Sequence, residues 1–233
     1  MPISLSRLTL KSTFFPGLNV RLAALPQLAR ITEEQLEIAR QLAIQRIRIE
    51  HIESAAQLHP DDQEFELKDL EDQVTHLMPK LLRGGFILTL WSVFERSLKD
   101  IVIRAGEFTN RPIADDFFRH NEFFRGVEIG MQSRAEVPAF PETSVFKRLK
   151  LLASVRQALI HHDGRRSETH TNLLSLQPIE LEAIGIILEH DYSFEYIVPT
   201  EAFMKDNTRL VIDYLHDAAG RVFDALVPGN SEA

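Results

Sequence analysis

The stretch FKRLKLLASVRQALIHHDGRR, residues 146–166, decides the fold because its apolar residues recur with the spacing of an amphipathic helix. With a turn of about 100° per residue, one arc of that helix carries apolar side chains and the other side carries polar ones. The apolar arc collects Val145, Phe146, Leu149, Leu152, Ala153, Leu159 and Ile160, and the polar side collects Lys147, Lys150, Ser154, Gln157 and His161. Arg156 falls near the middle of the apolar arc. A guanidinium keeps its proton when it is buried, so this position is costly unless an anion lies beside it.

A second apolar helix, residues 84–105, carries a candidate for that anion. Its apolar arc collects Ile87, Leu88, Leu90, Trp91, Phe94, Leu98, Ile101 and Val102. Glu95 lies at the edge of this arc. We therefore expect Glu95 to pair with Arg156 where the two helices pack. A structural ion pair without any function accounts for the same pattern equally well, and both interpretations stay open at this point.

The composition is that of an ordinary globular protein with one large domain or two small ones. The chain has 233 residues, of which 44% are hydrophobic and 26% are charged. It has no cysteine, which excludes disulfides and thiolate chemistry and favours a cytoplasmic location. The sequence has no run of about 18 apolar residues and no long apolar segment at the N-terminus, so we expect neither a membrane span nor a signal peptide. A net charge of −8 argues against a broad nucleic-acid-binding surface but leaves room for a local basic site.

Periodicity and turn signals predict a mostly α-helical bundle with a small β-hairpin before the C-terminal helix. Residues 1–30 are expected to form an extended N-terminal arm, and residues 31–227 a single helical domain. Five helices are predicted, over residues 32–58, 60–78, 84–108, 143–162 and 200–226. Thr32 and Gln35 have capping-box spacing at the start of the first helix, and Pro79 ends or kinks the second. Gly164 stops the fourth helix, and Thr200 caps the fifth. Short helices are expected within 109–142, a polar loop over 165–177, and the hairpin on either side of Asp191.

The two histidines at the end of the quoted stretch have two interpretations. His161 and His162 fall in the last turn of the predicted helix, where the helix dipole favours a positive charge. Surface histidines that complement the dipole, followed by the basic Arg165 and Arg166, account for this pattern without any function. Histidine is also the side chain best suited to acid–base chemistry near neutral pH, which makes both residues catalytic candidates.

The segment SVRQALIHHDGRR resembles the active motif of HEPN domains, in which an arginine is followed after four to six residues by a histidine at the end of a helix. Arg156 matches the arginine, His161 the histidine, and Gly164 the glycine that follows. Upstream, LWSVFERSLKDIV resembles the family's glutamate-bearing helix, and downstream GIILEHDYSFEYIVP resembles the hairpin of bacterial members. The resemblance covers roughly residues 80–226. Gln157 departs from the usual Asn, Asp or His after the arginine, and His162 stands where Asn is common.

The resemblance implies a metal-independent endoribonuclease of HEPN type that acts as a homodimer, with the motif helices of both copies at the interface. Arg156 would hold the phosphate and stabilise its charge, and His161 would transfer protons. Glu95, Gln157 and His162 would support them. The sequence offers no metal-ligand constellation and no cofactor motif, so neither is expected. The predicted partners are RNA, a second copy of the chain and, for a toxin or defence effector, an antitoxin.

A second class of function stays open, that of a non-catalytic HEPN-like interaction or nucleotide-binding module. The acidic net charge and the departure at Gln157 favour this alternative. The histidine that takes the motif role also stays open between His161 and His162, although the spacing to Gly164 favours His161.

Overall fold

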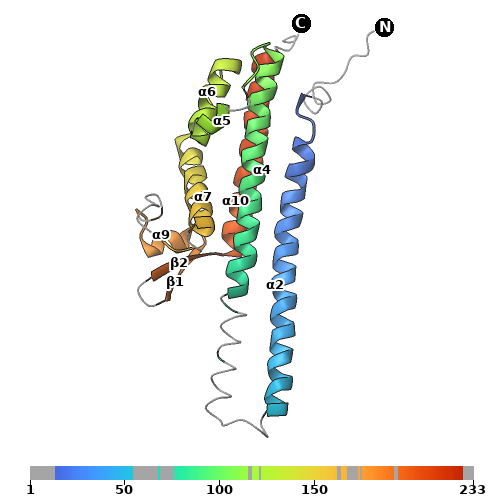
Figure 1. Ribbon diagram of the computed structural model, residues 1–233, viewed down its shortest axis with the longest axis vertical. Helices are drawn as coiled ribbons and strands as arrows, with labels where there is room; N and C mark the ends of the chain where they lie inside the picture. The colour runs from blue at the N-terminus through green and yellow to red at the C-terminus, as the bar shows by residue number, and fades with distance from the viewer. Residues whose placement is uncertain are drawn as a thin grey trace, which may run out of the picture. The chain divides into compact units, whose positions relative to one another are not determined.

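The computed structural model describes residues 14–54, 68, 75, 77–114, 117–120, 122–161, 164–166, 173, 175–191 and 194–227. It is mostly α-helical with a two-stranded antiparallel hairpin before the C-terminal helix, which confirms the predicted fold class (Figure 1). In chain order the elements are α2 (Leu18–Ser54), α4 (Met78–Phe108), α5 (Phe117–His120), α6 (Phe123–Ala135), α7 (Thr143–His161), α9 (Pro178–Ala183), β1 (Ile186–Asp191), β2 (Phe194–Pro199) and α10 (Glu201–Leu226). In the part of the chain described, no helix has the length and apolar character needed to cross a membrane.

The chain divides into two compact units, which are described separately. Unit 1 comprises Met1–Leu25, Leu90–Ala153 and Asn207–Ala233, and unit 2 comprises Pro26–Thr89 and Ser154–Asp206. The helices α2, α4, α7 and α10 each contain one of the boundaries. The prediction of a single helical domain over residues 31–227 stays a prediction.

The core of unit 1 is built around aromatic side chains. The centroid of the Phe94 ring lies 5.2 Å from that of Trp91 on the same helix and 5.9 Å from that of Tyr214 on α10. Phe124 of α6 lies 5.9 Å from Trp91 and 5.4 Å from Phe146 at the start of α7. Edge-to-face and tilted contacts of this kind add to the stabilisation that burial alone provides. Phe124, which is half-buried, therefore packs at the edge of this aromatic core.

A buried tyrosine fastens the segment before α7 to α10. The Tyr214 hydroxyl donates to the carbonyl of Ala139 over 2.8 Å. Arg221 donates to the same carbonyl over 3.1 Å and also to the carbonyl of Pro138. Burial raises the pKa of Tyr214 well above its ordinary value, because the phenolate would lose its hydration. The hydroxyl therefore stays a hydrogen-bond donor throughout the neutral range.

The hairpin of unit 2 pairs β1 with β2 over the full length of both strands. Ile186 lies opposite Pro199 at the open end, and Asp191 lies opposite Phe194 at the turn. Ile186 is buried and Ile187 is exposed, in agreement with the alternating pattern that predicts β1, whereas the neighbouring residues Ile197 and Val198 of β2 are both buried. The short helix α9 packs against β1, as Figure 1 shows.

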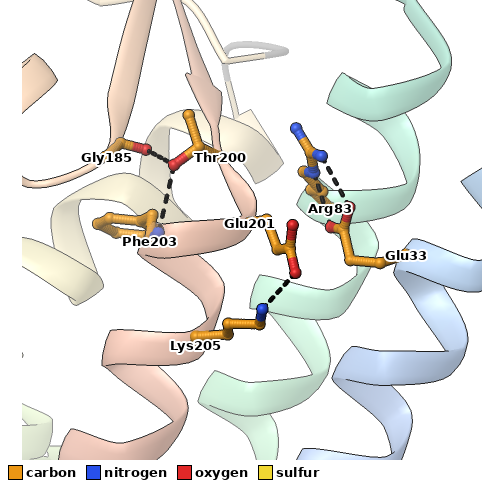
Figure 2. A network of polar contacts seen from close by, with 7 residues as sticks. All are labelled: Glu33, Arg83, Gly185, Thr200, Glu201, Phe203 and Lys205. Carbon is orange, nitrogen blue, oxygen red and sulfur yellow. Dashed lines mark hydrogen bonds and ion pairs between the residues drawn. The ribbon is translucent and has the colours of Figure 1, made fainter.

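Thr200 joins the open end of the hairpin to α10. Its hydroxyl donates to the carbonyl of Gly185 over 2.6 Å and accepts from the backbone N–H of Phe203 over 3.3 Å (Figure 2). Thr200 therefore caps α10, as the sequence predicts. Gly185 has a φ of +83°, and a β-carbon at this position would lie 2.7 Å from the Thr200 hydroxyl oxygen. Only glycine fits this junction.

The prediction of an extended arm over residues 1–30 is wrong from Leu18 onward, because α2 begins there. Residues 1–13 lie outside the described part of the chain. Pro26, inside α2, cannot donate the usual backbone hydrogen bond. The helix continues through this proline because apolar side chains are buried at helical spacing on one of its faces. These side chains are Leu18, Leu22, Leu25 and Ala29.

Three further predictions about helix ends need correction or remain outside the described residues. Thr32 is not a cap, because it lies inside α2 and its hydroxyl donates to the carbonyl of Leu28, one turn earlier, over 2.9 Å. Pro79 does not end a helix but stands in the first turn of α4, where its missing N–H is not needed. The helix predicted over 60–78 falls mostly outside the described part of the chain. The sequence analysis also missed the short helix α9.

Candidate functional site

The second half of α7 carries the residues of the predicted motif on and beside its exposed side. The completely buried side chains of this helix, which fix its orientation about its own axis, are Leu149, Leu152, Val155 and Ala158. Arg156 is half-buried, whereas Gln157 and His161 are exposed. The expectation of a buried guanidinium at Arg156 therefore needs correction, because this side chain keeps access to solvent.

Arg156 and Gln157 are joined by a hydrogen bond. Nη1 of Arg156 donates to Oε1 of Gln157 over 3.1 Å. This bond uses one of the five N–H donors of the guanidinium and fixes its orientation. His161 lies five residues further along the same helix, about 7.5 Å along the axis and about 140° around it. One α7 helix therefore presents the two motif residues in diverging directions.

The end of α7 agrees with the predicted stop. The described part of α7 extends to His161, and Gly164 adopts the left-handed conformation with a φ of 80°. Glycine is favoured in this conformation just after a helix because it has no β-carbon. The N–H of Gly164 donates to the carbonyl of Ala158 over 2.9 Å and so satisfies one of the last carbonyls of the helix. His162 lies outside the described residues, so its role stays a prediction.

The segment that follows α7 runs antiparallel to β2. The N–H of Ile197 donates to the carbonyl of Gly164 over 2.8 Å. The N–H of Arg166 donates to the carbonyl of Glu195 over 2.8 Å. These backbone hydrogen bonds attach the end of α7 to the hairpin and fix its position within unit 2.

Cationic side chains and an aromatic ring stand beside this helix end. A β-carbon added to Gly164 would lie 3.3 Å from Cε of Lys80 in the first turn of α4. The Lys80 ammonium lies 4.3 Å from the centre of the Tyr196 ring, within the range of a cation–π contact. Tyr196 also pairs with Arg165 in a β-bridge. The sequence analysis missed Lys80 and Tyr196, because only the folded chain brings them next to the segment that follows His161.

Arg166 has a structural role. Its side chain is 9% exposed and forms an ion pair with Glu195 at 2.8 Å. It also donates to the carbonyls of Leu173 and Leu176 over 3.1 and 2.6 Å. These bonds tie β2 to the chain just before α9.

The first turns of α4 are held from two sides within unit 2. A β-carbon added to Gly84 would lie 3.5 Å from Cδ2 of Leu159, so α4 closely approaches the last turns of α7. Nε and Nη2 of Arg83, the preceding residue, donate to the two carboxylate oxygens of Glu33 over 2.8 and 2.7 Å (Figure 2). Both side chains are 20% exposed, so this bidentate pair is largely shielded from water. The pair fixes α4 to α2.

A second ion pair of unit 2 joins Lys205 and Glu201 in the first turns of α10 (Figure 2). The hydrogen bond to Glu201 is the main cause of the raised pKa of Lys205, and the charge of Glu201 is the next. The charge of Glu33 on α2 raises this pKa further. Glu33 therefore acts on Lys205 as well as on Arg83, and the ion pairs of α2, α4 and α10 form one electrostatic group.

Glu95 has partners on its own helix. It accepts hydrogen bonds from Lys99 over 2.5 Å and from Nε1 of Trp91 over 3.2 Å, each one turn away on α4. Its side chain is 31% exposed. The carboxylate therefore has a cation beside it without Arg156. Glu95 belongs to unit 1 and Arg156 to unit 2, and the ion pair between them stays a prediction.

Across the described residues, no group of three or more histidine, aspartate and glutamate side chains is placed to hold a metal ion. Comparisons with known proteins give no match: no family model fits the sequence, and neither curated proteins nor solved structures are similar to it. The resemblance to HEPN domains therefore rests on the quoted motifs alone. The function has to be argued from the residues around the end of α7.

Proposed function

We propose that this protein is a metal-independent endoribonuclease of HEPN type, in which Arg156 and His161 are the catalytic residues. The observation that carries the proposal is the last described turn of α7, where His161 is exposed, together with Gly164, which has the left-handed conformation. This is the register that the motif requires of its histidine and glycine. Gln157 and His162 support the site, and Glu95 is a more distant support.

The reaction needs the two side-chain types that α7 presents. The 2′-hydroxyl of a ribose attacks the adjacent phosphorus, the bond to the 5′-oxygen of the next nucleotide breaks, and a 2′,3′-cyclic phosphate forms. A group near neutral pH must take or give a proton, which suits the imidazole of His161. Negative charge develops on the phosphate oxygens, which suits the guanidinium of Arg156. Gln157 holds Arg156 through one N–H and leaves four N–H groups of the guanidinium for other acceptors.

The neighbours of this helix end support binding of a phosphodiester chain. Lys80 and Arg165 add positive charge beside the segment that follows α7, although the whole chain carries a net charge of −8. Cations that contact phosphates supply most of the sequence-independent affinity for nucleic acid. Tyr196 offers an aromatic face for stacking of an unpaired base. The net charge of −8 argues against a broad nucleic-acid-binding surface but is compatible with a local basic site of this kind.

A homodimer would complete the site. Because Arg156 and His161 diverge by about 140° on one helix, a second α7 from another copy can bring an arginine close to a histidine of the first. An RNA strand would then meet both residue types at one place. An antitoxin that covers this helix end would silence the enzyme, which fits a toxin or defence effector.

The test is cleavage of a mixed RNA by the purified protein in excess chelator. We expect His161→Ala to lower the cleavage rate by about 100-fold or more, because proton transfer by a positioned side chain contributes a factor of this size. Arg156→Ala should be similarly impaired, and His162→Ala less so. The matched controls are His216→Ala, at an exposed histidine of α10, and Arg148→Ala, at an exposed arginine of α7. Cleavage that His161→Ala retains at the wild-type rate would reject the proposal.

Ligand binding without catalysis is a second candidate function, favoured by a cleft in unit 1. The cleft has a volume of about 300 Å³ and is lined by three arginines, two acids and Ser97. Ser97 is completely buried, and its hydroxyl has no hydrogen-bond partner among the described residues. Buried hydroxyls are normally paired, so a bound molecule would satisfy this one. Calorimetric titration with nucleoside monophosphates tests the idea, and absence of binding at millimolar concentration would end it.

A further inference from the structure

The outward side of α2 carries an apolar stripe with the spacing of a coiled-coil seam. The residues of this stripe are Ile31, Gln35, Ile38, Leu42, Gln45 and Ile49, and all of them are exposed. Successive members alternate between four and three residues apart, which is the spacing of the a and d positions of a heptad repeat. The four apolar members are between 45% and 61% exposed. All six belong to unit 2.

Among the described residues, the stripe lies outside the buried face of α2. Along α2 the buried side chains are Leu18, Leu22, Leu25, Ala29 and Leu36, and they define the inward face of the helix. On a helical wheel the stripe is centred about 150° away from this face. A helix that carries a second apolar seam opposite its core face has a surface suited to another helix.

The stripe has a twofold pattern. Ile31 and Ile49 are equally far from Arg40, and so are Gln35 and Gln45, and Ile38 and Leu42. A second α2 that runs in the opposite direction, with a twofold axis at Arg40, therefore sets every a position against a d position. Ile31 then packs against Ile49 of the other copy, Ile38 against Leu42, and Gln35 against Gln45. A glutamine pair can satisfy both amides, and a shift in register would bury them against apolar side chains.

We propose that residues 31–49 of α2 bind the same segment of a second copy of the chain as an antiparallel coiled coil. This interface does not include α7, so the proposal is independent of the ribonuclease activity. A ribonuclease dimer that meets through α7 could use the α2 seam to join further copies. The partner is a second copy, because the pattern of apolar and glutamine side chains matches itself after rotation about one axis.

Disulfide crosslinking tests the pairing directly, because the chain has no cysteine of its own. Ile31→Cys and Ile49→Cys are prepared as separate full-length proteins and oxidised alone or mixed. In the antiparallel arrangement each variant alone stays uncrosslinked, and the mixture gives a disulfide-linked pair. Residues 31 and 49 of one helix are about 27 Å apart, so no disulfide forms within one chain. Crosslinking of each variant alone would show parallel pairing and overturn the proposal.

Light scattering over a concentration series gives the independent readout. Ile38→Glu combined with Leu42→Glu should lower the average molar mass of the assembly, because association through α2 is lost, with an unchanged helical signal. Ile44→Glu is the matched control, at a residue that is 38% exposed on the same helix but outside the stripe. This control should associate as the wild type does. If the wild type is monomeric at about 100 μM and its cysteine variants do not crosslink in the mixture, a different protein covers the stripe and the proposal is overturned.

Discussion

At the scale of single residues, Tyr214 is the clearest test of the core of unit 1. Its hydroxyl donates to the carbonyl of Ala139 from a buried position. Tyr214→Phe removes this bond, while Arg221 still donates to the same carbonyl. We therefore expect a loss of about 1 kcal/mol in the free energy of unfolding at pH 7. Chemical denaturation of both proteins measures it.

The pH dependence of that difference follows from the raised pKa of Tyr214. Above pH of about 10 the unfolded tyrosine loses its proton while the buried one keeps it, so the wild type loses stability as pH rises. Tyr214→Phe lacks this loss. The gap in stability between the two proteins should therefore narrow above pH of about 10. A gap that stays constant up to pH of about 11 would contradict the burial of this hydroxyl.

Gly185 tests the junction between the hairpin and α10. Gly185→Ala forces a φ of +83° on alanine and places its β-carbon 2.7 Å from the Thr200 hydroxyl oxygen and 2.8 Å from the nitrogen of Phe203. We expect a loss of about 1–3 kcal/mol in the free energy of unfolding. Gly85→Ala is the control, because nothing lies within 4 Å of a β-carbon there, and in a helix this change should stabilise by about 0.5–1 kcal/mol. Thermal unfolding distinguishes the two, and equal effects would contradict the close approach.

The charged residues of the motif show what sequence can settle at this scale. The wheel identified Arg156 as unusual and predicted a buried guanidinium, yet this side chain is only half-buried. The wheel also does not show that Lys99 and Trp91, each one turn from Glu95, donate hydrogen bonds to its carboxylate. Periodicity gives the direction of a side chain only to within a fraction of a turn. Whether a charge at the edge of an apolar arc is buried depends on packing that one helix does not contain.

At the scale of elements, the Arg83–Glu33 pair should fix α2 and α4 to each other. Arg83→Ala leaves the Glu33 carboxylate, 20% exposed, without its bidentate partner, and we expect a loss of about 1–2 kcal/mol. A double-mutant cycle with Glu33→Ala should give a coupling of about 1 kcal/mol. The control is the exposed pair Arg30–Glu34 on α2, with an N···O distance of 3.6 Å, whose coupling should be close to zero. Equal couplings would show that the partial burial of Arg83 has no energetic effect.

Elements with strong local signals are predictable from this sequence, and elements that depend on tertiary packing are not. The bounds of α7, the hairpin and the cap at Thr200 agree with their predictions, because periodicity, alternation and capping chemistry act locally. The start of α2 was missed because Pro26 was interpreted as the end of a helix. Burial of the side chains around Pro26 keeps the helix continuous. The capping-box spacing at Thr32 was misleading for the same reason. Lys80 and Tyr196 reach the site only through long-range pairing that leaves no local signal.

At the scale of the whole molecule there are two proposals. Arg156 and His161, at the end of α7 in unit 2, catalyse RNA cleavage, and copies of the chain associate through α2. The helix end supplies proton transfer and phosphate binding, and the α2 seam supplies a way to bring copies together. The two proposals can fail separately, because the first is tested by cleavage and the second by crosslinking. A protein that cleaves RNA but gives no crosslink through α2 would retain the first and reject the second.

The most direct measurement uses a synthetic oligonucleotide that is deoxyribose throughout except for one ribonucleotide. The purified protein is incubated with it in excess chelator, and the products are weighed by mass spectrometry. The account predicts a single cut after the ribonucleotide, a 2′,3′-cyclic phosphate on the upstream fragment, and no cut with His161→Ala. An all-deoxy oligonucleotide should stay intact, because it has no 2′-hydroxyl to attack the phosphorus. An intact ribonucleotide substrate, or equal cutting of the all-deoxy control, would contradict the ribonuclease mechanism.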